Sequence, residues 1–198
     1  MDLYRVKPAV LRGLGPVLDR LERRGVSPDV LTLASVPVAA IGGLAVILSP
    51  TAPLVLLVVP AAVVIRLLLN LLDGALARRT GAVHARGEFY NELGDRLGDV
   101  LMLAPVAFVP GAHAPTVFLG VAMGLLASYA SVATKAAGGS RTYRGVLSKP
   151  GRMVLLTITA IVVLLVGPAA WAPFGALLLV GTTLTLVERI VLAQRQLP

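Results

Sequence analysis

Six apolar stretches, each long enough to cross a bilayer as a helix, dominate this chain of 198 residues. A membrane-spanning helix needs roughly 20 mostly apolar residues. Hydrophobic residues make up 57% of the chain and charged residues only 14%, whereas roughly a quarter of an average soluble protein is charged. We therefore expect an all-α integral membrane protein with six transmembrane helices in one bundle. The expected spans are residues 28–48, 53–78, 88–109, 115–137, 150–167 and 171–195.

The segment before the first span is amphipathic. Between Val10 and Leu21 apolar residues recur at helical spacing, and arginines occupy the opposite face. This pattern predicts an interfacial helix, bent at Pro16, that lies along an anionic leaflet with its leucines toward the acyl chains. Ser27 and Pro28 then predict the N-cap and first turn of the first span. We expect an amphipathic juxtamembrane helix over residues 1–26 and one transmembrane domain over residues 27–198.

Nearly all lysines and arginines lie at one set of span ends, so that only alternate connections between the spans carry them. The connections around residues 49–53, 110–115 and 167–171 contain neither. Because cytoplasmic loops carry an excess of these residues, we expect both termini on the cytoplasmic side of the cytoplasmic (inner) membrane. The net charge of +8 has the same explanation, and no soluble basic module remains that would bind nucleic acid. Cysteine is absent, which excludes a disulfide framework and a thiolate nucleophile.

Half of the ten acidic residues lie in or beside the second and third spans. Charge at membrane depth is costly, so ionisable residues there indicate a metal, a polar substrate or a proton pathway. On each of the two spans, polar and very small residues recur at helical spacing and so share a face. These stripes are Asn70, Asp73, Gly74 and Ala77 on the second span, and Asn91, Asp95 and Asp99 on the third.

Facing oxygen ligands from two helices suit a hard divalent cation such as Mg²⁺ or Mn²⁺. Glycines in the same region leave room for a phosphate or a nucleotide, and Arg78 offers a bidentate phosphate donor. The same residues also permit a buried ion-pair network, in which Asp95 binds Arg66 or Arg96, and an ion or proton pathway. Spacing and chemistry leave these three interpretations open. In each of them the site lies at the cytoplasmic ends of the two spans.

The spacing resembles the signature of the CDP-alcohol phosphatidyltransferases, class I. That signature is Asp, two residues, Asp-Gly, two residues, Ala-Arg, about eight residues, Gly, three residues, Asp, three residues, Asp. The match in spacing is complete over 26 residues, although Asn70 and Asn91 stand where the family has its first and third aspartates. The stretches 28–32 and 149–152 also resemble family segments. An amphipathic helix followed by six spans is likewise the family's architecture, so the resemblance covers nearly the whole chain.

The resemblance implies a reaction of phospholipid biosynthesis. A small, possibly phosphorylated alcohol would attack CDP-diacylglycerol, CMP would leave, and a phospholipid would form, with two Mg²⁺ or Mn²⁺ ions bridging the diphosphate. The alternatives are a catalytically silent relative that binds lipid or nucleotide, and a small membrane transporter. A transporter would show internal repeats, and we find no such symmetry around the acidic cluster.

The resemblance also implies roles for single residues. Two formal charges are missing from the signature, and Asp99, one turn beyond Asp95, is our first candidate for compensation. Asp95 would be a ligand or the base that accepts the proton of the acceptor hydroxyl. The expected metal ligands are Asn70, Asp73, Asn91, Asp95 and Asp99, and the expected residues of the cytidine-diphosphate pocket are Gly74, Ala77, Arg78 and Gly87.

The acceptor site is less well defined by the sequence. Clustered cations favour a phosphorylated alcohol, although positive-inside topology alone also explains basic residues in a cytoplasmic loop. The cations concerned are Arg141, Arg144, Lys149 and Arg152. The family implies a homodimer, and small residues such as Gly42, Gly43, Gly120 and Gly124 suit close contact between helices, but they do not identify the face.

Overall fold

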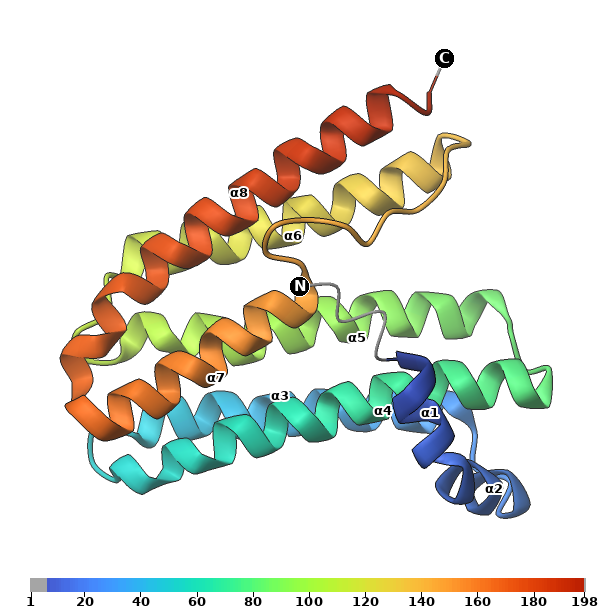
Figure 1. Ribbon diagram of the computed structural model, residues 1–198, viewed down its shortest axis with the longest axis horizontal. Coiled ribbons are helices and arrows are strands. Elements are labelled where there is room, and N and C mark those ends of the chain that lie inside the picture. Colours follow the sequence, from blue (N-terminus) through green and yellow to red (C-terminus); the bar gives the residue numbers. More distant parts are fainter. Residues whose placement is uncertain (1–6, 198) are drawn as a thin grey trace.

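The computed structural model describes residues 7–197, and the side chains of residues 10–197, as a bundle of helices (Figure 1). No strand occurs in this part of the chain, which confirms the all-α prediction. Residues 1–6 of the predicted juxtamembrane helix lie outside the described residues. The helices are α1 (Lys7–Gly13), α2 (Gly15–Arg23), α3 (Pro28–Leu48), α4 (Val58–Thr80), α5 (Ala85–Leu103), α6 (Ala114–Ala136), α7 (Lys149–Val166) and α8 (Ala172–Gln194), with 3₁₀ turns η2 (Pro53–Leu57), η3 (Ala104–Phe108) and η4 (Pro168–Trp171).

The six long helices follow the predicted spans to within a few residues. Five of them, including η2 with α4 and η4 with α8, are long and apolar enough to cross a membrane. The helix outside this group is α5, which carries the acidic cluster and holds six charged residues. The prediction of six spans is therefore confirmed for five helices by hydropathy, and α5 forms as a helix at the expected place.

The start of the first span is also as predicted. Ser27 is extended, and its hydroxyl accepts a hydrogen bond from the backbone N–H of Asp29 at 3.3 Å. Pro28 occupies the first turn, where its missing N–H costs nothing. The residues that begin α3 thus fix where the chain leaves the amphipathic segment.

The amphipathic segment forms two helices and not one bent helix. Pro16 lies in the first turn of α2 and not inside a continuous helix. The guanidinium of Arg79, on α4, binds Asp19 and Glu22 of α2, each at 2.7 Å. The leucine face that the sequence assigns to acyl chains packs in part on the bundle, because Leu18 is buried in a cluster with Leu31, Leu72 and Leu76.

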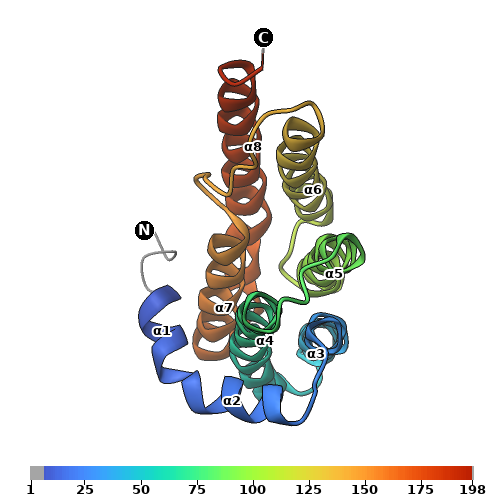
Figure 2. The same ribbon diagram turned by 90° about the vertical axis from the view of Figure 1, so that its right-hand side faces the viewer.

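The long helices divide into two groups. The helices α3, α4, α5 and α7 run side by side, whereas α6 and α8 pack along each other and lean away from the rest (Figure 2). The three connections without lysine or arginine lie together at one end of the bundle (Figure 1). The N-terminal helices, the α4–α5 turn, the α6–α7 loop and the C-terminus are at the other end.

The four glycines considered for a dimer interface lie between helices of the same chain. A Cβ atom on Gly43 would overlap the carbonyl oxygen of Leu101 on α5. One on Gly120 would lie 2.9 Å from the backbone nitrogen of Leu179 on α8. Gly42 and Gly124 face Met102 and Thr182 in the same way. These positions are therefore used within one molecule and supply no free surface for a second copy.

Candidate active site

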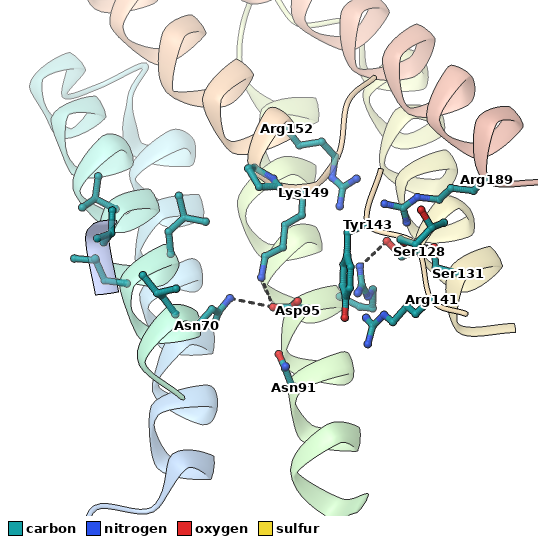
Figure 3. A pocket seen from close by; sticks show the side chains of 18 residues that line it. Asn70, Asn91, Asp95, Ser128, Ser131, Arg141, Tyr143, Lys149, Arg152 and Arg189 are labelled. Carbon is teal, nitrogen blue, oxygen red and sulfur yellow. Dashed lines mark hydrogen bonds and ion pairs between the residues drawn. The ribbon is translucent and has the colours of Figure 1, made fainter. Parts of the chain in front are cut away.

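A cavity of about 650 Å³ lies between α4 and α5 on one side and α6, α7 and α8 on the other (Figure 3). This volume lies in the range of ligand sites, which hold roughly 300–1,000 Å³. One wall is apolar and comes mainly from α4. The other walls carry oxygen-bearing side chains of α4, α5 and α6 and cations of the α6–α7 loop, α7 and α8.

Asn70 and Asp95 join the two helices of the signature at the cavity wall (Figure 3). Asn70 Nδ2 donates a hydrogen bond to Asp95 Oδ1 at 3.0 Å. This bond fixes the orientation of the amide, because two oxygens would repel each other. Asn70 Oδ1 is then left buried without a hydrogen-bond partner among the described residues. A buried carbonyl oxygen of this kind is suited to bind a cation.

Asp95 is held from two further directions. Lys149, in the first turn of α7, forms an ion pair with Asp95 Oδ1. Arg66, on α4, donates from Nη2 to the backbone carbonyl of Asp95 at 2.9 Å. Asn91 lines the same wall one turn earlier on α5. The carboxylate of Asp95 is therefore fixed in position between α4, α5 and α7.

Asp73 is buried beneath this wall and does not line the cavity itself. Its Oδ2 accepts a hydrogen bond from the hydroxyl of Thr32, on α3, at 2.7 Å. Its Oδ1 accepts one from the backbone N–H of Gly74. Both oxygens of the Asp73 carboxylate are therefore held by hydrogen bonds from α3 and α4, one turn along α4 from Asn70.

Asp99 does not replace the missing charge of Asn91, and this expectation is corrected. Arg66 Nη1 binds Asp99 Oδ1 at 3.2 Å, and Arg152 Nη2 binds Asp99 Oδ2 at 2.5 Å. Its side chain is only 4% exposed. Both carboxylate oxygens are occupied by guanidinium groups in the centre of the bundle, so neither is available to a metal ion.

Three of the four cations assigned to the acceptor line the cavity, namely Arg141, Lys149 and Arg152. Arg141 forms an ion pair with Glu92, and its guanidinium lies 4.8 Å from the centre of the Tyr143 ring. The fourth, Arg144, does not line the cavity and its side chain is exposed. It contributes its carbonyl oxygen, which accepts a hydrogen bond from Arg189 Nε at 3.0 Å.

The residues assigned to the nucleotide lie outside the cavity. Gly74, Ala77 and Arg78 are on the last turns of α4, where an added Cβ on Gly74 would lie 3.4 Å from Arg78 Nη1. Gly87 is in the first turn of α5, and a Cβ there would lie 3.1 Å from Asp29 Oδ1. The structure gathers these residues near the α4–α5 turn but does not place them in the cavity, and their role stays a prediction.

Sequence reasoning missed several residues of the cavity. Arg189, on α8, is buried at the cavity wall, and Arg66, considered from the sequence as a partner of Asp95, is buried in the bundle outside the cavity lining. An arginine isolated in an apolar run is the signal that points to such residues. The α6–α7 loop has no such pattern. The cavity residues not identified from sequence include Ser128, Ser131, Tyr143 and Arg189.

The side chains in this region can be compared with the ligands that a metal ion prefers. No three histidine, cysteine, aspartate or glutamate side chains gather into a metal site within residues 10–197. The available donors are the oxygens of Asn70, Asp73, Asn91 and Asp95. Oxygen donors suit Mg²⁺ or Mn²⁺ better than a thiophilic ion. The buried Asn70 Oδ1, which has no hydrogen-bond partner among the described residues, is an oxygen of the kind that such an ion binds.

Residues 26–191 match the family described as CDP-alcohol phosphatidyltransferase. The chain belongs to this family. It is therefore a transferase of phospholipid biosynthesis with several membrane helices. The family uses the divalent ions Mg²⁺ or Mn²⁺, in agreement with the oxygen donors found here.

Three relatives match most of the chain. The inner membrane protein YnbA of Escherichia coli is 29% identical over 82% of this chain and 81% of its own length. The archaetidylinositol phosphate synthase of Aeropyrum pernix is 32% identical over 86% and 84%. The phosphatidylinositol phosphate synthase of Mycolicibacterium smegmatis is 31% identical over 88% and 81%.

The fold of the family is also present in solved structures. The phosphatidylinositol phosphate synthase of Mycobacterium tuberculosis with bound CDP-diacylglycerol superimposes with a TM-score of 0.76 at 23% identity, over 91% of this chain and 93% of that one. The same protein in complex with manganese and citrate gives a TM-score of 0.76, again at 23% identity and over 91% of this chain and 88% of that one. The helical arrangement described above is therefore the arrangement of this family.

Proposed function

We propose that this enzyme transfers the phosphatidyl group of CDP-diacylglycerol to a small phosphorylated alcohol and releases CMP. The observation that carries the proposal is the hydrogen bond between Asn70 and Asp95 at the wall of the cavity. It joins the two ends of the family signature across α4 and α5, opposite a group of cations. Membership of the family supports the reaction class.

The proposed reaction is a single displacement at phosphorus. The hydroxyl oxygen of the acceptor forms a bond to the lipid-bearing phosphorus of CDP-diacylglycerol. The bond from that phosphorus to the bridging oxygen breaks, and CMP leaves with the electron pair. The hydroxyl proton passes to Asp95, which acts as general base. Lys149 binds the Asp95 carboxylate, and Arg66 binds the backbone carbonyl of Asp95, so both hold this residue in position for the transfer.

Asn70, Asp73 and Asn91 would hold Mg²⁺ or Mn²⁺, which would supply stabilisation of negative charge in phosphoryl transfer. Thr32 supports this set by holding the Asp73 carboxylate from α3. Gly74, Ala77, Arg78 and Gly87 would shape the place of the cytidine diphosphate near the α4–α5 turn. The apolar wall of α4, with Val64, Leu67 and Leu68, would accept the lipid part.

The acceptor class follows from the cations of the cavity. Arg141, Lys149 and Arg152 line one region together with Arg189, and clustered guanidinium groups favour a phosphate dianion over a neutral hydroxyl compound. Two relatives are named as synthases of inositol phosphate lipids. An inositol phosphate or another phosphorylated polyol is therefore the acceptor class we favour.

The same proposal includes an arrangement in the membrane. We take α5 as a span as well, which brings the number to six, because its charged residues bind side chains of α4, α6, α7 and the α6–α7 loop. Both termini and the site would then face the cytoplasm across the inner membrane. The enzyme would act as a homodimer, as the resemblance implies, through a face other than the internal glycines. Cysteine-accessibility labelling of single-cysteine variants tests the topology.

The reaction is tested by CMP release from CDP-diacylglycerol with purified protein, with and without Mg²⁺ or Mn²⁺. The acceptors are inositol phosphate and glycerol 3-phosphate, compared with inositol, glycerol and serine. We expect metal-dependent release with a phosphorylated acceptor only. Release with an unphosphorylated alcohol would refute the acceptor class. Bound CDP-lipid without release for any acceptor would make the chain a silent relative.

Arg141→Gln tests the acceptor site because Arg141 lines the cavity from a loop. Removing one charge-assisted hydrogen bond costs about 1.5–3 kcal/mol, so the KM for the phosphorylated acceptor should rise at least roughly tenfold. The KM for CDP-diacylglycerol should change little. Arg195→Gln, at an exposed arginine outside the cavity, is the matched control.

A further inference from the structure

Six charged side chains gather where α4, α5 and α7 meet. Arg66 and Arg152 pair with Asp99, and Lys149 pairs with Asp95. Asp73 is buried on α4, one turn from Asn70, which binds Asp95. Three of these side chains are positive and three are negative, so the group is neutral before any metal ion binds. Four are almost fully buried, namely Arg66, Asp73, Asp99 and Arg152. Added charge is therefore poorly screened in this place.

Neutrality limits how many divalent ions this group can accept. One divalent ion adds two positive charges, which the two negative charges of a bound diphosphate cancel. A second ion would leave an excess of two positive charges in the interior of the bundle. Asn70 and Asn91, as neutral ligands, offer carbonyl oxygens but no charge to offset it.

Lys149 already places a positive charge beside Asp95. Its ammonium group binds Asp95 Oδ1, the oxygen that also accepts the hydrogen bond from Asn70. Lys149 is fixed there because Pro150 follows it in the first turn of α7 and because its side chain is only 18% exposed. A second ion bound to Asp95 Oδ1 would have to displace this ammonium group.

We propose that Lys149 takes the place of a second divalent ion, and that this enzyme binds a single divalent ion per chain. The inference rests on the proposed function for the identity of the diphosphate substrate. The single ion binds to Asn70 Oδ1 and to oxygens of Asp73 and Asn91, which leaves Asp95 Oδ2 to accept the proton of the acceptor hydroxyl. The ammonium of Lys149 supplies the remaining positive charge beside the substrate.

The number of bound ions is measured by electron paramagnetic resonance during a Mn²⁺ titration of the purified protein, without substrate and with CDP-diacylglycerol. Free Mn²⁺ gives a strong signal that bound Mn²⁺ does not, so the titration counts bound ions. Two ions in one site lie about 4 Å apart and alter each other's spectrum. We expect one ion per chain and an uncoupled spectrum with CDP-diacylglycerol, and weaker Mn²⁺ binding without it, because no diphosphate then offsets the charge of the ion.

Variants that change the charge of this group should change the number of bound ions or the affinity for Mn²⁺. In the triple variant Asn70→Asp, Asn91→Asp, Lys149→Met we expect two ions per chain and a coupled spectrum. Lys149→Met alone should still bind one ion, at least roughly tenfold more tightly, because a neighbouring positive charge is gone. Lys149→Arg keeps the charge and should bind as the wild type does. Lys135→Met is the matched control, because its ion pair with Glu88 is half exposed and outside the cavity.

The outcomes separate this inference from the proposed function. Two ions or none in the wild-type chain with bound CDP-diacylglycerol would overturn the inference, and so would unchanged Mn²⁺ affinity in Lys149→Met. The number of ions bound by the wild-type chain is decisive by itself, so the test does not depend on whether any variant folds. CMP release is measured on the same preparation. One bound ion without CMP release would overturn the proposed reaction and leave the ion count standing.

Discussion

Arg66 and Asp99 form a buried ion pair, with 3.2 Å between Nη1 and Oδ1. Arg152 binds the second oxygen of the same carboxylate, so Asp99 joins α4, α5 and α7. The pair lies one turn below Asp95, whose backbone carbonyl also accepts a hydrogen bond from Arg66. One arginine thus connects the core of the bundle to the wall of the cavity.

Asp99→Asn should destabilise the fold and leave the metal site unchanged. Removing one partner of a buried ion pair costs about 3–5 kcal/mol, because the other charge remains buried. Thermal unfolding in detergent should therefore start at a much lower temperature, while the folded fraction keeps the Mn²⁺ count of the wild type. Glu88→Gln, at an ion pair that is half exposed, should cost no more than about 1 kcal/mol. A stable Asp99→Asn protein that has lost its metal would contradict our correction of Asp99.

Gly98→Ala should disturb the ion pair of Arg66 and Asp99, because Gly98 lies against the Arg66 guanidinium. An added Cβ would lie 2.5 Å from Arg66 Cζ, so the guanidinium must move. Overpacking of this kind costs about 1–3 kcal/mol. We expect a lower unfolding temperature and a lower rate of CMP release in the folded protein. Gly13→Ala, where no atom lies within 4 Å of the new Cβ, is the control, and equal unfolding temperatures in the two variants would refute the prediction.

Asp95→Asn should remove turnover but not CDP-lipid binding. The amide keeps the shape of the carboxylate but accepts no proton, and a general base contributes roughly 10²–10⁴-fold. CMP release should therefore fall at least about 100-fold, while a labelled CDP-lipid still binds, with reduced affinity. Asp19→Asn, on α2 and outside the cavity, serves as control. Turnover near the wild-type rate would exclude Asp95 as the base.

Leu18 should hold α2 on the bundle more firmly than the ion pairs of Arg79 do. Leu18 is buried against α3 and α4, and truncation of a buried leucine costs about 2 kcal/mol or more. The exposed pairs of Arg79 with Asp19 and Glu22 are each worth at most about 1 kcal/mol. Trypsin cleavage after the arginines of α2 should be much faster in Leu18→Ala than in Arg79→Ala. The reverse order would show that charge, and not packing, attaches α2.

The helix positions follow from the sequence because local signals determine them. Apolar runs of about 20 residues set the lengths, and Ser27 with Pro28 sets the start of α3. The break between α1 and α2 was placed less well, since Pro16 permits both a bend and a new first turn. Spacing within one helix also placed Asn70 and Asp95 correctly on facing stripes, because the period of the helix alone decides which side chains share a face.

The ion pairs of the site do not follow from spacing. Asp95 and Asp99 occupy equivalent positions on α5, yet one lines the cavity and the other lies between two arginines. The partners are 33 and 53 residues away in the sequence, so only the packing of α4 and α7 decides between a ligand and a structural carboxylate. Arg144 differs from Arg141 for a similar reason, because a loop without regular structure has no period from which orientation can be inferred.

The pairing of Arg66 with Asp99 also bears on how the chain enters the membrane during synthesis. An arginine near the centre of a lone helix costs about 3 kcal/mol on insertion, and α5, with six charged residues, is too polar to enter lipid readily by itself. When the two helices enter together, the charges of Arg66 and Asp99 neutralise each other, so α4 and α5 are best inserted as a hairpin. A nascent chain interrupted between them would present an uncompensated intramembrane cation, the kind of defect by which cellular quality control recognises an unfinished membrane protein.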